Sequence, residues 1–249
     1  MINHFDLNGI QWFMVAICGL LVGFSKTGIN GVGMLAIPLM AQLFGGKNSA
    51  AVMLPMLIVG DMFAIKQYRQ HTKWNYIWKL APWTLIGLVL GLFTGNLIKD
   101  QQFKEIIAIS VLVCLGIMLW MELKKGEKAV PHQLWFAALL GLAGGFTTMI
   151  GNAAGPVMTI YFLSMQLPKY EYIGTGAWFF GILNLLKLPL QIIFWGSINW
   201  NTLMFDGLLI PAIAIGAYLG VKTVKHIPEK PFRWIVLGLA GVSAIRLFF

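Results

Sequence analysis

Long stretches without a charged residue constrain this chain more than any other feature. The runs Trp83–Ile98 and Ile106–Met121 are each 16 residues long and contain no Asp, Glu, Lys or Arg. A helix needs about 20 predominantly apolar residues to cross the ~30 Å hydrocarbon core of a bilayer. Inside that core a segment must satisfy its own backbone hydrogen bonds, and the alternating pattern of barrel strands is missing here. We therefore expect an all-α polytopic integral membrane protein.

Similar apolar runs, bounded by Gly, Pro or charged residues, recur along the whole sequence. Four of them are only 13 residues long, which is short for a full crossing, so adjacent pairs can also be re-entrant hairpins. The expected number of membrane segments is therefore about eight to ten. The predicted segments are Ile10–Val22, Val32–Phe44, Ala50–Ile65, Ile77–Ile98, Phe103–Met121, Leu134–Phe146, Ala153–Met165, Ile173–Trp195, Leu203–Leu219 and Phe232–Phe249.

The charge distribution indicates a membrane topology and excludes a nucleic-acid surface. Only 11% of the residues are charged, against about 25% in soluble domains, and the formal net charge is +9. The basic residues do not form one patch but gather in short connectors such as Lys66–Lys79, Lys124–Lys128 and Lys222–Arg233. Because cytoplasmic loops are enriched in Lys and Arg, these connectors, together with Lys26, are predicted to lie inside the cell.

The two cysteines, Cys18 and Cys114, each lie alone in an apolar run. No Cys-x-x-Cys or Cys/His spacing typical of a redox or zinc site accompanies them. We expect both to be small buried residues, and the sequence predicts no metal and no cofactor.

A tandem duplication is the most informative pattern in the sequence. Gly19–Gly33 matches Gly141–Gly155 at an offset of 122 residues, and Trp74–Asn75 recurs as Trp200–Asn201. The predicted repeats are residues 1–126 and 127–249, which together form one membrane domain. The glycine pair Gly91 and Gly95 is also matched with Gly216 and Gly220.

An odd number of segments per repeat forces the second copy to start on the opposite side of the membrane. The two halves are then related by a pseudo-two-fold axis in the membrane plane, as in many transporters. Combined with the charge bias, this arrangement predicts that both termini are external.

Each repeat contains a glycine-rich interruption between two short apolar runs, Ser25–Gly31 in the first and Thr147–Asn152 in the second. Interrupted helices at matching places in inverted repeats mark transporter binding sites, and the exposed helix N-termini favour anions. The alternative is that the glycines permit close helix packing and the hydroxyls bond nearby carbonyls. The candidate binding residues are Ser25, Lys26, Thr27, Asn30, Gly31, Thr147, Thr148, Asn152 and Gly155.

Two ionisable residues occur inside apolar segments, Asp61 in the first repeat and Lys187 in the corresponding segment of the second. Allowing one gap, Asn184 aligns with Asp61. Buried ionisable groups are costly in a membrane, so they usually face a cavity and have a partner. One interpretation is a proton-binding carboxylate and an anion-binding ammonium on one pathway, with Asp61 and Asn184 as coupling residues. The alternatives are a structural ion pair or a lysine that reaches the interface.

The repeated Gly-x-x-x-Gly-Phe-[Ser/Thr] element, the following Pro38, the Trp-Asn pairs and the two-repeat layout resemble the sulfite exporter TauE/SafE family of permeases. The resemblance covers essentially the whole chain. It implies a multi-pass carrier in a bacterial or archaeal inner membrane that moves, often outwards, small anions such as sulfite or sulfonates. Neither break contains an arginine, so a bidentate clamp on a sulfonate is missing.

The leading hypothesis is a secondary transporter of a small anion, because no Walker motif for ATP is present. The partners expected are that anion, the lipid bilayer and a coupling proton, and an oligomer is compatible with the sequence. One alternative is an intramembrane enzyme, although neither HExxH nor Gly-x-Ser-x-Gly occurs. The other is a membrane subunit that scaffolds partners and transports nothing.

Overall fold

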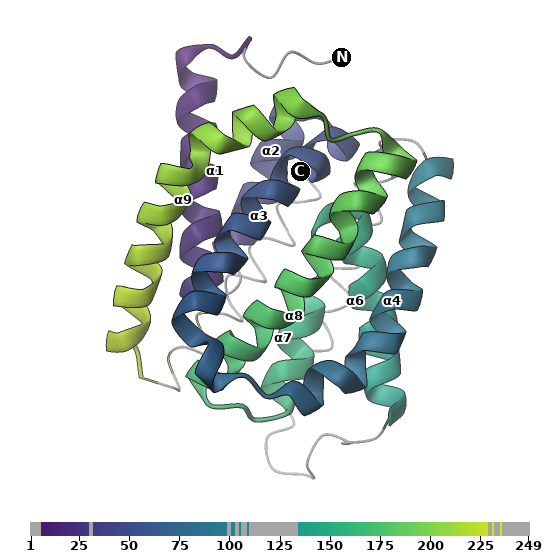
Figure 1. The fold of residues 1–249 in the computed structure, drawn as a ribbon, viewed down its shortest axis with the longest axis vertical. Helices are drawn as coiled ribbons and strands as arrows, with labels where there is room; N and C mark the ends of the chain where they lie inside the picture. The colour runs from purple at the N-terminus through teal and green to yellow at the C-terminus, as the bar shows by residue number, and fades with distance from the viewer. Residues whose placement is uncertain are drawn as a thin grey trace.

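Six long helices form the described part of the protein (Figure 1). The computed structural model describes residues 6–29, 32–98 and 134–228, together with positions 101, 102, 105, 109, 231 and 235. All six helices are long and apolar enough to cross a membrane, and the described ranges contain no strand. The prediction of an all-α polytopic membrane protein is confirmed. The long helices are α1 (Gly9–Thr27), α3 (Gly46–Tyr68), α4 (Trp74–Leu97), α6 (Leu134–Gly151), α8 (Lys169–Leu190) and α9 (Trp200–His226).

Shorter elements connect some of these helices. The α-helices α2 (Ala36–Phe44) and α7 (Gly155–Ser164) follow the two glycine-rich interruptions. Single turns of other helix types also occur: η1 (Val32–Leu35), η2 (Arg69–His71) and a π-helical turn, η3 (Gln191–Trp195). The predicted segments Phe103–Met121 and Phe232–Phe249 fall almost entirely outside the described residues, so the total number of segments stays a prediction.

The four segments predicted to be 13 residues long differ in the structure. Helices α1 and α6 have 19 and 18 residues, enough to cross, because the polar residues expected in the breaks belong to the helices. In contrast, α2 and α7 have 9 and 10 residues. At about 1.5 Å per residue they extend only ~15 Å, half of a bilayer core. Each pair is therefore one long and one half-length helix.

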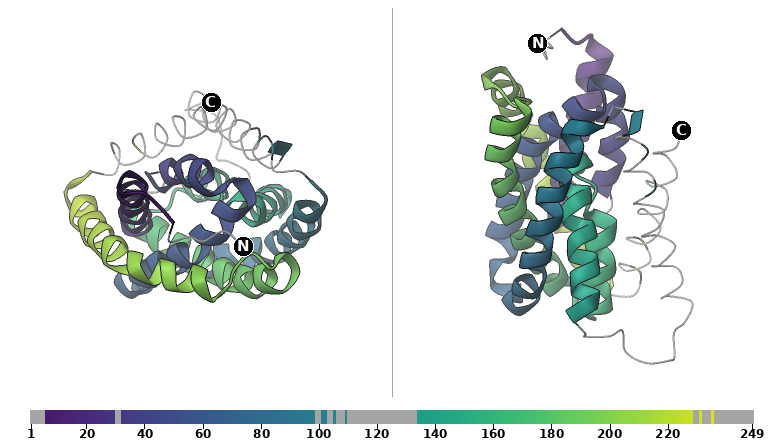
Figure 2. Two further views of the ribbon diagram at one scale, coloured as in Figure 1. Left: turned by 90° about the horizontal axis from the view of Figure 1, so that it is seen from above. Right: turned by 90° about the vertical axis from the view of Figure 1, so that its right-hand side faces the viewer.

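The two pairs enter from opposite ends of the molecule. In Figure 1, α1 starts at the top and α2 lies near that end, whereas α6 starts at the bottom and α7 lies near the bottom. Both views show α9 and α4 on opposite flanks, with α3 and α8 between them (Figure 2). This layout agrees with what an inverted repeat predicts, and the duplication itself stays a prediction.

Glycines let α1 pack closely on α9 and α6 on α4, so each pair joins one repeat to the other. A Cβ atom on Gly23 would lie 2.0 Å from the carbonyl oxygen of Ile213. A Cβ atom on Gly145 would lie 2.0 Å from the carbonyl oxygen of Thr84. Any side chain at either glycine would therefore force the helix backbones apart. These two glycines precede the interruptions Ser25–Gly31 and Thr147–Asn152, and they permit close helix packing.

The reverse contacts are also alike. A Cβ atom on Gly216 would lie 2.0 Å from the oxygen of Leu20, and one on Gly87 would lie 2.1 Å from the oxygen of Leu142. The predicted repeat pairs Leu20 with Leu142, and under that prediction these contacts pair Gly216 with Gly87, one turn before the Gly91 of the sequence match.

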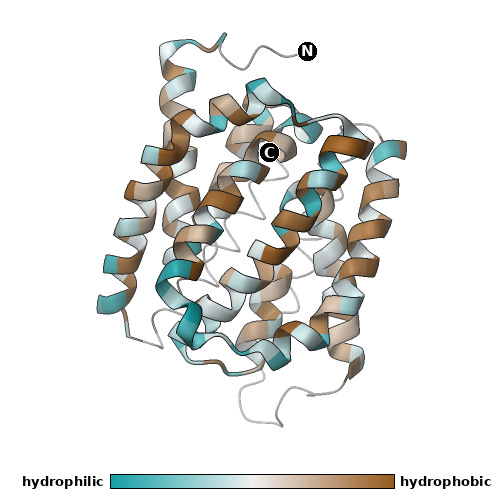
Figure 3. Ribbon diagram, in the orientation of Figure 1, coloured by the Kyte–Doolittle hydropathy of each residue, from teal (hydrophilic) through white to brown (hydrophobic). Residues whose placement is uncertain are grey.

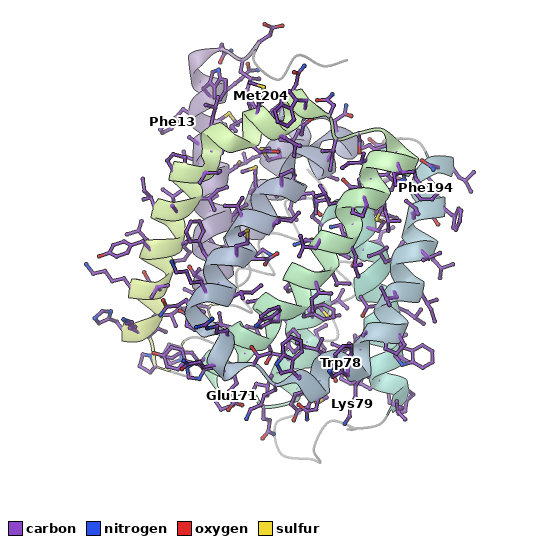
Figure 4. All side chains as sticks on the ribbon, viewed as in Figure 1. Phe13, Trp78, Lys79, Glu171, Phe194 and Met204 are labelled. Carbon is purple, nitrogen blue, oxygen red and sulfur yellow. The ribbon has the colours of Figure 1, made fainter. Side chains whose placement is uncertain are left out.

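The outer surface is apolar. Large hydrophobic side chains on α4 and α9, including Phe93 and Leu208, are more than half exposed. Hydrophilic residues gather at the lower ends of α3 and α9 (Figure 3). Phe13, Phe194 and Met204 lie toward the upper end, and Trp78, Lys79 and Glu171 toward the lower end (Figure 4). This is the surface of a protein whose sides face lipid and whose ends face water. Inside the bundle, Cys18 is fully buried, as predicted, and Cys114 lies outside the described residues.

Candidate functional site

The second break is a tight helix terminus built around one asparagine. Asn152 adopts a left-handed backbone conformation with φ of 54°, which asparagine tolerates better than most residues. The N–H of Ala153 donates to the carbonyl of Thr147 over 3.2 Å, and that of Asn152 to the carbonyl of Thr148 over 3.1 Å. These bonds close the end of α6, and the one from Asn152 to Thr148 is that of an αL cap motif. The break is confined to residues 152–154, just before α7.

The first break is also narrower than predicted. Ser25, Lys26 and Thr27 form the last turn of α1, and Gly28 follows. A Cβ atom on Gly28 would lie 2.9 Å from the Cα atom of Gly220, so this glycine is required by close contact with α9. Asn30 and Gly31 lie outside the described residues, and their predicted roles stay predictions.

Two predicted threonines bond to helix carbonyls. Thr27 Oγ1 donates to the oxygens of Gly23 and Ala217, at 3.1 and 2.7 Å. Thr147 Oγ1 donates to the oxygen of Ala143 at 2.8 Å. Such back-bonding satisfies a threonine hydroxyl within a helix, and both threonines lie near the C-terminal ends of helices that end inside the predicted breaks. The structure does not bring these two hydroxyls to the cavity described next.

A cavity of about 70 Å³ lies between the two breaks. Both glycine-rich regions contribute to it, together with α3 and α8. Six of the predicted residues line its wall: Ser25, Lys26, Thr148, Asn152, Gly155 and Asn184. The other lining residues are Gly33, Ile37, Met53, Leu57 and Phe180.

Asp61 has two polar partners beside this cavity. Its Oδ1 lies 2.7 Å from Nζ of Lys26, and its Oδ2 accepts a 2.7 Å bond from the amide of Asn184. The Asp61 side chain is 1% exposed and that of Lys26 12%. Asp61 and Asn184, which the alignment treats as equivalent, are thus in direct contact.

The ion-pair partner of Asp61 therefore differs from the one that the sequence suggested. We expected Lys187, and the structure provides Lys26, which we had placed in the cytoplasm. The reason is local: a Cβ atom on Gly60 would lie 3.0 Å from Cγ of Lys26, so the missing side chain gives the lysine room. The Lys26 ammonium also lies 4.7 Å from the ring centre of Phe180, a cation–π contact.

Lys187 is completely buried and has only neutral partners. Its ammonium donates to Thr148 Oγ1 at 3.2 Å, to Asn184 Oδ1 at 3.3 Å and to Asn152 Oδ1. The amide nitrogen of Asn152 in turn donates to the carbonyl of Ala50 at 2.9 Å. All three partners line the cavity, so Lys187 lies directly behind its wall.

The charges of this cluster do not cancel. Lys26 and Asp61 neutralise each other, while Lys187 has no ion-pair partner among the described residues. A buried charge without a counter-ion is unfavourable unless a ligand or solvent compensates it. When Lys187 is protonated, the cluster beside the cavity has a net positive charge, and hydroxyl and amide groups surround it. Such an arrangement attracts an anion and can replace part of its hydration shell.

The sequence analysis missed two buried polar residues, Gln191 and Asp206. Gln191 is 0% exposed and Asp206 4% exposed. Neither the amide nitrogen and oxygen of Gln191 nor the two carboxylate oxygens of Asp206 have a hydrogen-bond partner in the structure as described. Each lies inside a predicted apolar segment, so the polar residue itself was the available signal. Within the same described residues, no cluster of three His, Cys, Asp or Glu side chains could hold a metal ion.

Comparison with known proteins agrees with a membrane carrier. A family model described as "Sulfite exporter TauE/SafE" matches residues 15–247. The chain is 21% identical to the "Probable membrane transporter protein MamO" of Magnetospirillum gryphiswaldense, over 90% of this chain and 45% of that protein. It is 19% identical to the protein of the same name from Paramagnetospirillum magneticum, over 72% of this chain and 34% of the relative. The chain thus spans less than half the length of these curated relatives. No solved structure matches.

Proposed function

This chain belongs to the sulfite exporter TauE/SafE family, and on that premise we propose that it is a secondary transporter of small anions of the sulfite or organosulfonate type. The anion binds near the middle of the membrane, in the cavity between the two helix breaks. Export is the direction that the family's description favours. The protein lies in a bacterial or archaeal inner membrane.

The uncompensated charge of Lys187 carries this proposal. The ammonium is fully buried, and it donates hydrogen bonds to three neutral oxygens, those of Thr148, Asn152 and Asn184. A carboxylate in that position would make the cluster neutral and remove the reason for an anion to enter. The neutral oxygens instead leave the positive charge available, and an anion can take their place around it.

The cavity suits a small ligand. Its volume is about 70 Å³, and a buried water needs at least about 10–15 Å³ by the same measure. The space therefore holds a handful of waters or one anion of a few heavy atoms. Gly155, at the start of α7, lines the cavity, so the positive end of this helix supports the same ligand charge.

Asp61 provides a route to proton coupling. When it is ionised, Asp61 neutralises Lys26 at 2.7 Å. When it is protonated, that ammonium is released toward the cavity that Lys26 lines. A bound proton then increases the positive charge available to the anion, and a bound anion favours the protonated carboxyl. Asn184 holds the carboxylate in place from the other side.

The basic helix ends support an orientation in which both termini are external. The C-terminal end of α3 and the N-terminal end of α4, which carry Lys66, Arg69, Lys73 and Lys79, meet at the lower end in Figure 1. The start of α1 lies at the opposite end. Because positive residues mark the cytoplasmic side, the lower end is the cytoplasmic one in this proposal.

The test is sulfite flux through the purified full-length protein in proteoliposomes. Wild-type protein should move sulfite faster than empty liposomes do. Lys187→Met should reduce flux at least about tenfold, because a hydrogen bond to a charged group contributes about 1.5–3 kcal/mol. The matched control, Lys79→Met, removes an exposed lysine at the lower end and should keep flux within about twofold.

Two results would contradict the proposal. A folded wild-type protein that moves neither sulfite nor a short organosulfonate would favour a scaffolding subunit instead. Wild-type flux in Lys187→Met protein would show that the charge of Lys187 is not needed for anion transport. Melting temperature separates these from misfolding, since Lys187→Met removes an uncompensated buried charge and should melt no lower than wild type.

A further inference from the structure

Gln191 has an unusual environment for a buried amide. Its side chain is fully buried, yet neither the amide nitrogen nor the amide oxygen has a hydrogen-bond partner in the described structure. A glutamine amide offers two donors and an acceptor, and burying them unsatisfied is unfavourable. The polarity of Gln191 therefore requires an explanation.

Gln191 continues the polar face of α8. Asn184, Lys187 and Gln191 are spaced by three and four residues, so they lie above one another on one side of the helix. All three are buried. The first two belong to the cluster around the cavity, and Gln191 lies one turn further toward the end of the helix. A line of polar groups thus leads away from the central cavity.

The backbone changes at this residue. Gln191 starts the π-helical turn Gln191–Trp195, which ends at Gly196 in a left-handed conformation with φ of 57°. Single π-helical turns often occur at functional sites. The upper end of α8, shown in Figure 1, is where this turn leads into the connection to α9.

The first repeat has a polar residue at the equivalent place. The offset of 123 that matches Asp61 with Asn184 also matches Tyr68 with Gln191. Tyr68 is the last residue of α3, and its hydroxyl donates to the carbonyl of Thr27 at 2.8 Å. The hydroxyl of Tyr68 at the end of α3 therefore has a hydrogen-bond partner, whereas the amide of Gln191 at the end of α8 has none in the described structure.

We propose that Gln191 contacts the anion on its way between the central cavity and the membrane face at the end of α8. The free amide N–H groups replace water around the anion after it leaves Lys187. The inference rests on the proposed transport of small anions, and it adds a second binding residue on one side of the central site. Tyr68 is its counterpart toward the opposite face.

The experiment compares the full-length wild type with Gln191→Met, Gln191→Glu and the control Leu190→Met. Leu190 is the neighbouring, half-buried residue of α8, and its side chain is apolar, so this change alters no polar group. Sulfite flux in proteoliposomes and the melting temperature with and without sulfite are measured. Gln191→Met should reduce flux at least about fivefold, and Gln191→Glu at least about tenfold, because it adds a negative charge. Leu190→Met should stay within about twofold.

The melting temperatures distinguish a transport role from a structural one. Without sulfite, Gln191→Met should melt at or above the wild-type temperature, because an unsatisfied buried amide is removed. Its gain in melting temperature with sulfite should equal that of the wild type, since the central site is intact. Wild-type flux in Gln191→Met, or a clearly lower melting temperature, overturns the inference. A wild type that neither moves sulfite nor gains melting temperature with it shows instead that the proposed function fails.

Discussion

The two helix breaks lie beside similar close glycine contacts and differ in their charges. In the first, the cation Lys26 belongs to the broken helix itself, and Asp61 of α3 neutralises it at 2.7 Å. In the second, α6 carries no charge, and the cation Lys187 comes from α8 and meets only neutral groups. The glycine packing around both breaks is nearly the same. Close glycine packing is thus common to both breaks, while the charged side chains around them differ.

The largest expected effect is the loss of stability when the Lys26–Asp61 ion pair of the first break is removed. Lys26→Met leaves the carboxylate of Asp61 buried without its cation and should lower stability by about 3–5 kcal/mol. Asp61→Asn should cost less, because the Lys26 ammonium can turn toward the cavity that it lines. The double variant should recover most of the loss. Thermal unfolding of the detergent-purified variants measures all three.

The same variants test the coupling role of Asp61. Asp61→Asn keeps the Asn184 contact and mimics the protonated carboxyl, so sulfite flux should lose its pH dependence while binding persists. If the pH profile of folded Asp61→Asn matches that of the wild type, Asp61 is not the coupling group. If Lys26→Met is as stable as the wild type, the first break is not held by this pair, and the contrast with Lys187 disappears.

The next effect is the loss of stability when the close glycine packing near each break is disturbed. Gly23→Ala and Gly145→Ala each place a methyl group 2.0 Å from a carbonyl oxygen of the facing helix, and should each destabilise by about 1–3 kcal/mol. Gly207→Ala is the control, because a Cβ atom there meets nothing within 4 Å. It should stabilise α9 by up to about 1 kcal/mol. Clearly unequal losses at Gly23 and Gly145 would show that the shared packing is not energetically equivalent.

The smallest expected effect is a difference in stability loss between variants of two lysines, Lys47 and Lys169. They are 122 residues apart, which is the offset between the two predicted breaks. Lys169 is buried, and its ammonium donates to the carbonyls of Val224 and Ile227, at 2.9 and 2.8 Å, at the end of α9. Lys47 donates to the side chain of Asn96, at 3.2 Å, near the end of α4. Lys169→Met should cost about 1–2 kcal/mol, because it removes a cation bonded to a helix C-terminus.

Lys47→Met should cost under about 1 kcal/mol, because its hydrogen bond is exposed to solvent. The comparison of the two melting temperatures tests whether the second repeat is the more firmly anchored half. Equal losses would show that exposure does not distinguish the two contacts.

Local sequence predicted the candidate site best where a single residue type defines the conformation. Asn152 was selected for its place in a glycine-rich break, and its left-handed backbone and contact with Lys187 fit that selection. Thr27 and Thr147 were selected for the same reason but bond to helix carbonyls. A hydroxyl can either bond back to its own helix or point away, and the sequence does not distinguish these rotamers.

The sequence by itself determined the apolar helices, the positions of the two breaks and the identities of the buried ionisable residues. Hydrophobic length and glycine placement are local properties, so the amino-acid sequence is enough to define them. Only the tertiary structure decided which charges meet. Spacing along a helix specifies which residues share a face, but which helix faces them is set by packing between separate helices. Lys26 therefore meets Asp61 because Gly60 leaves space beside it, and Lys187 meets only neutral partners.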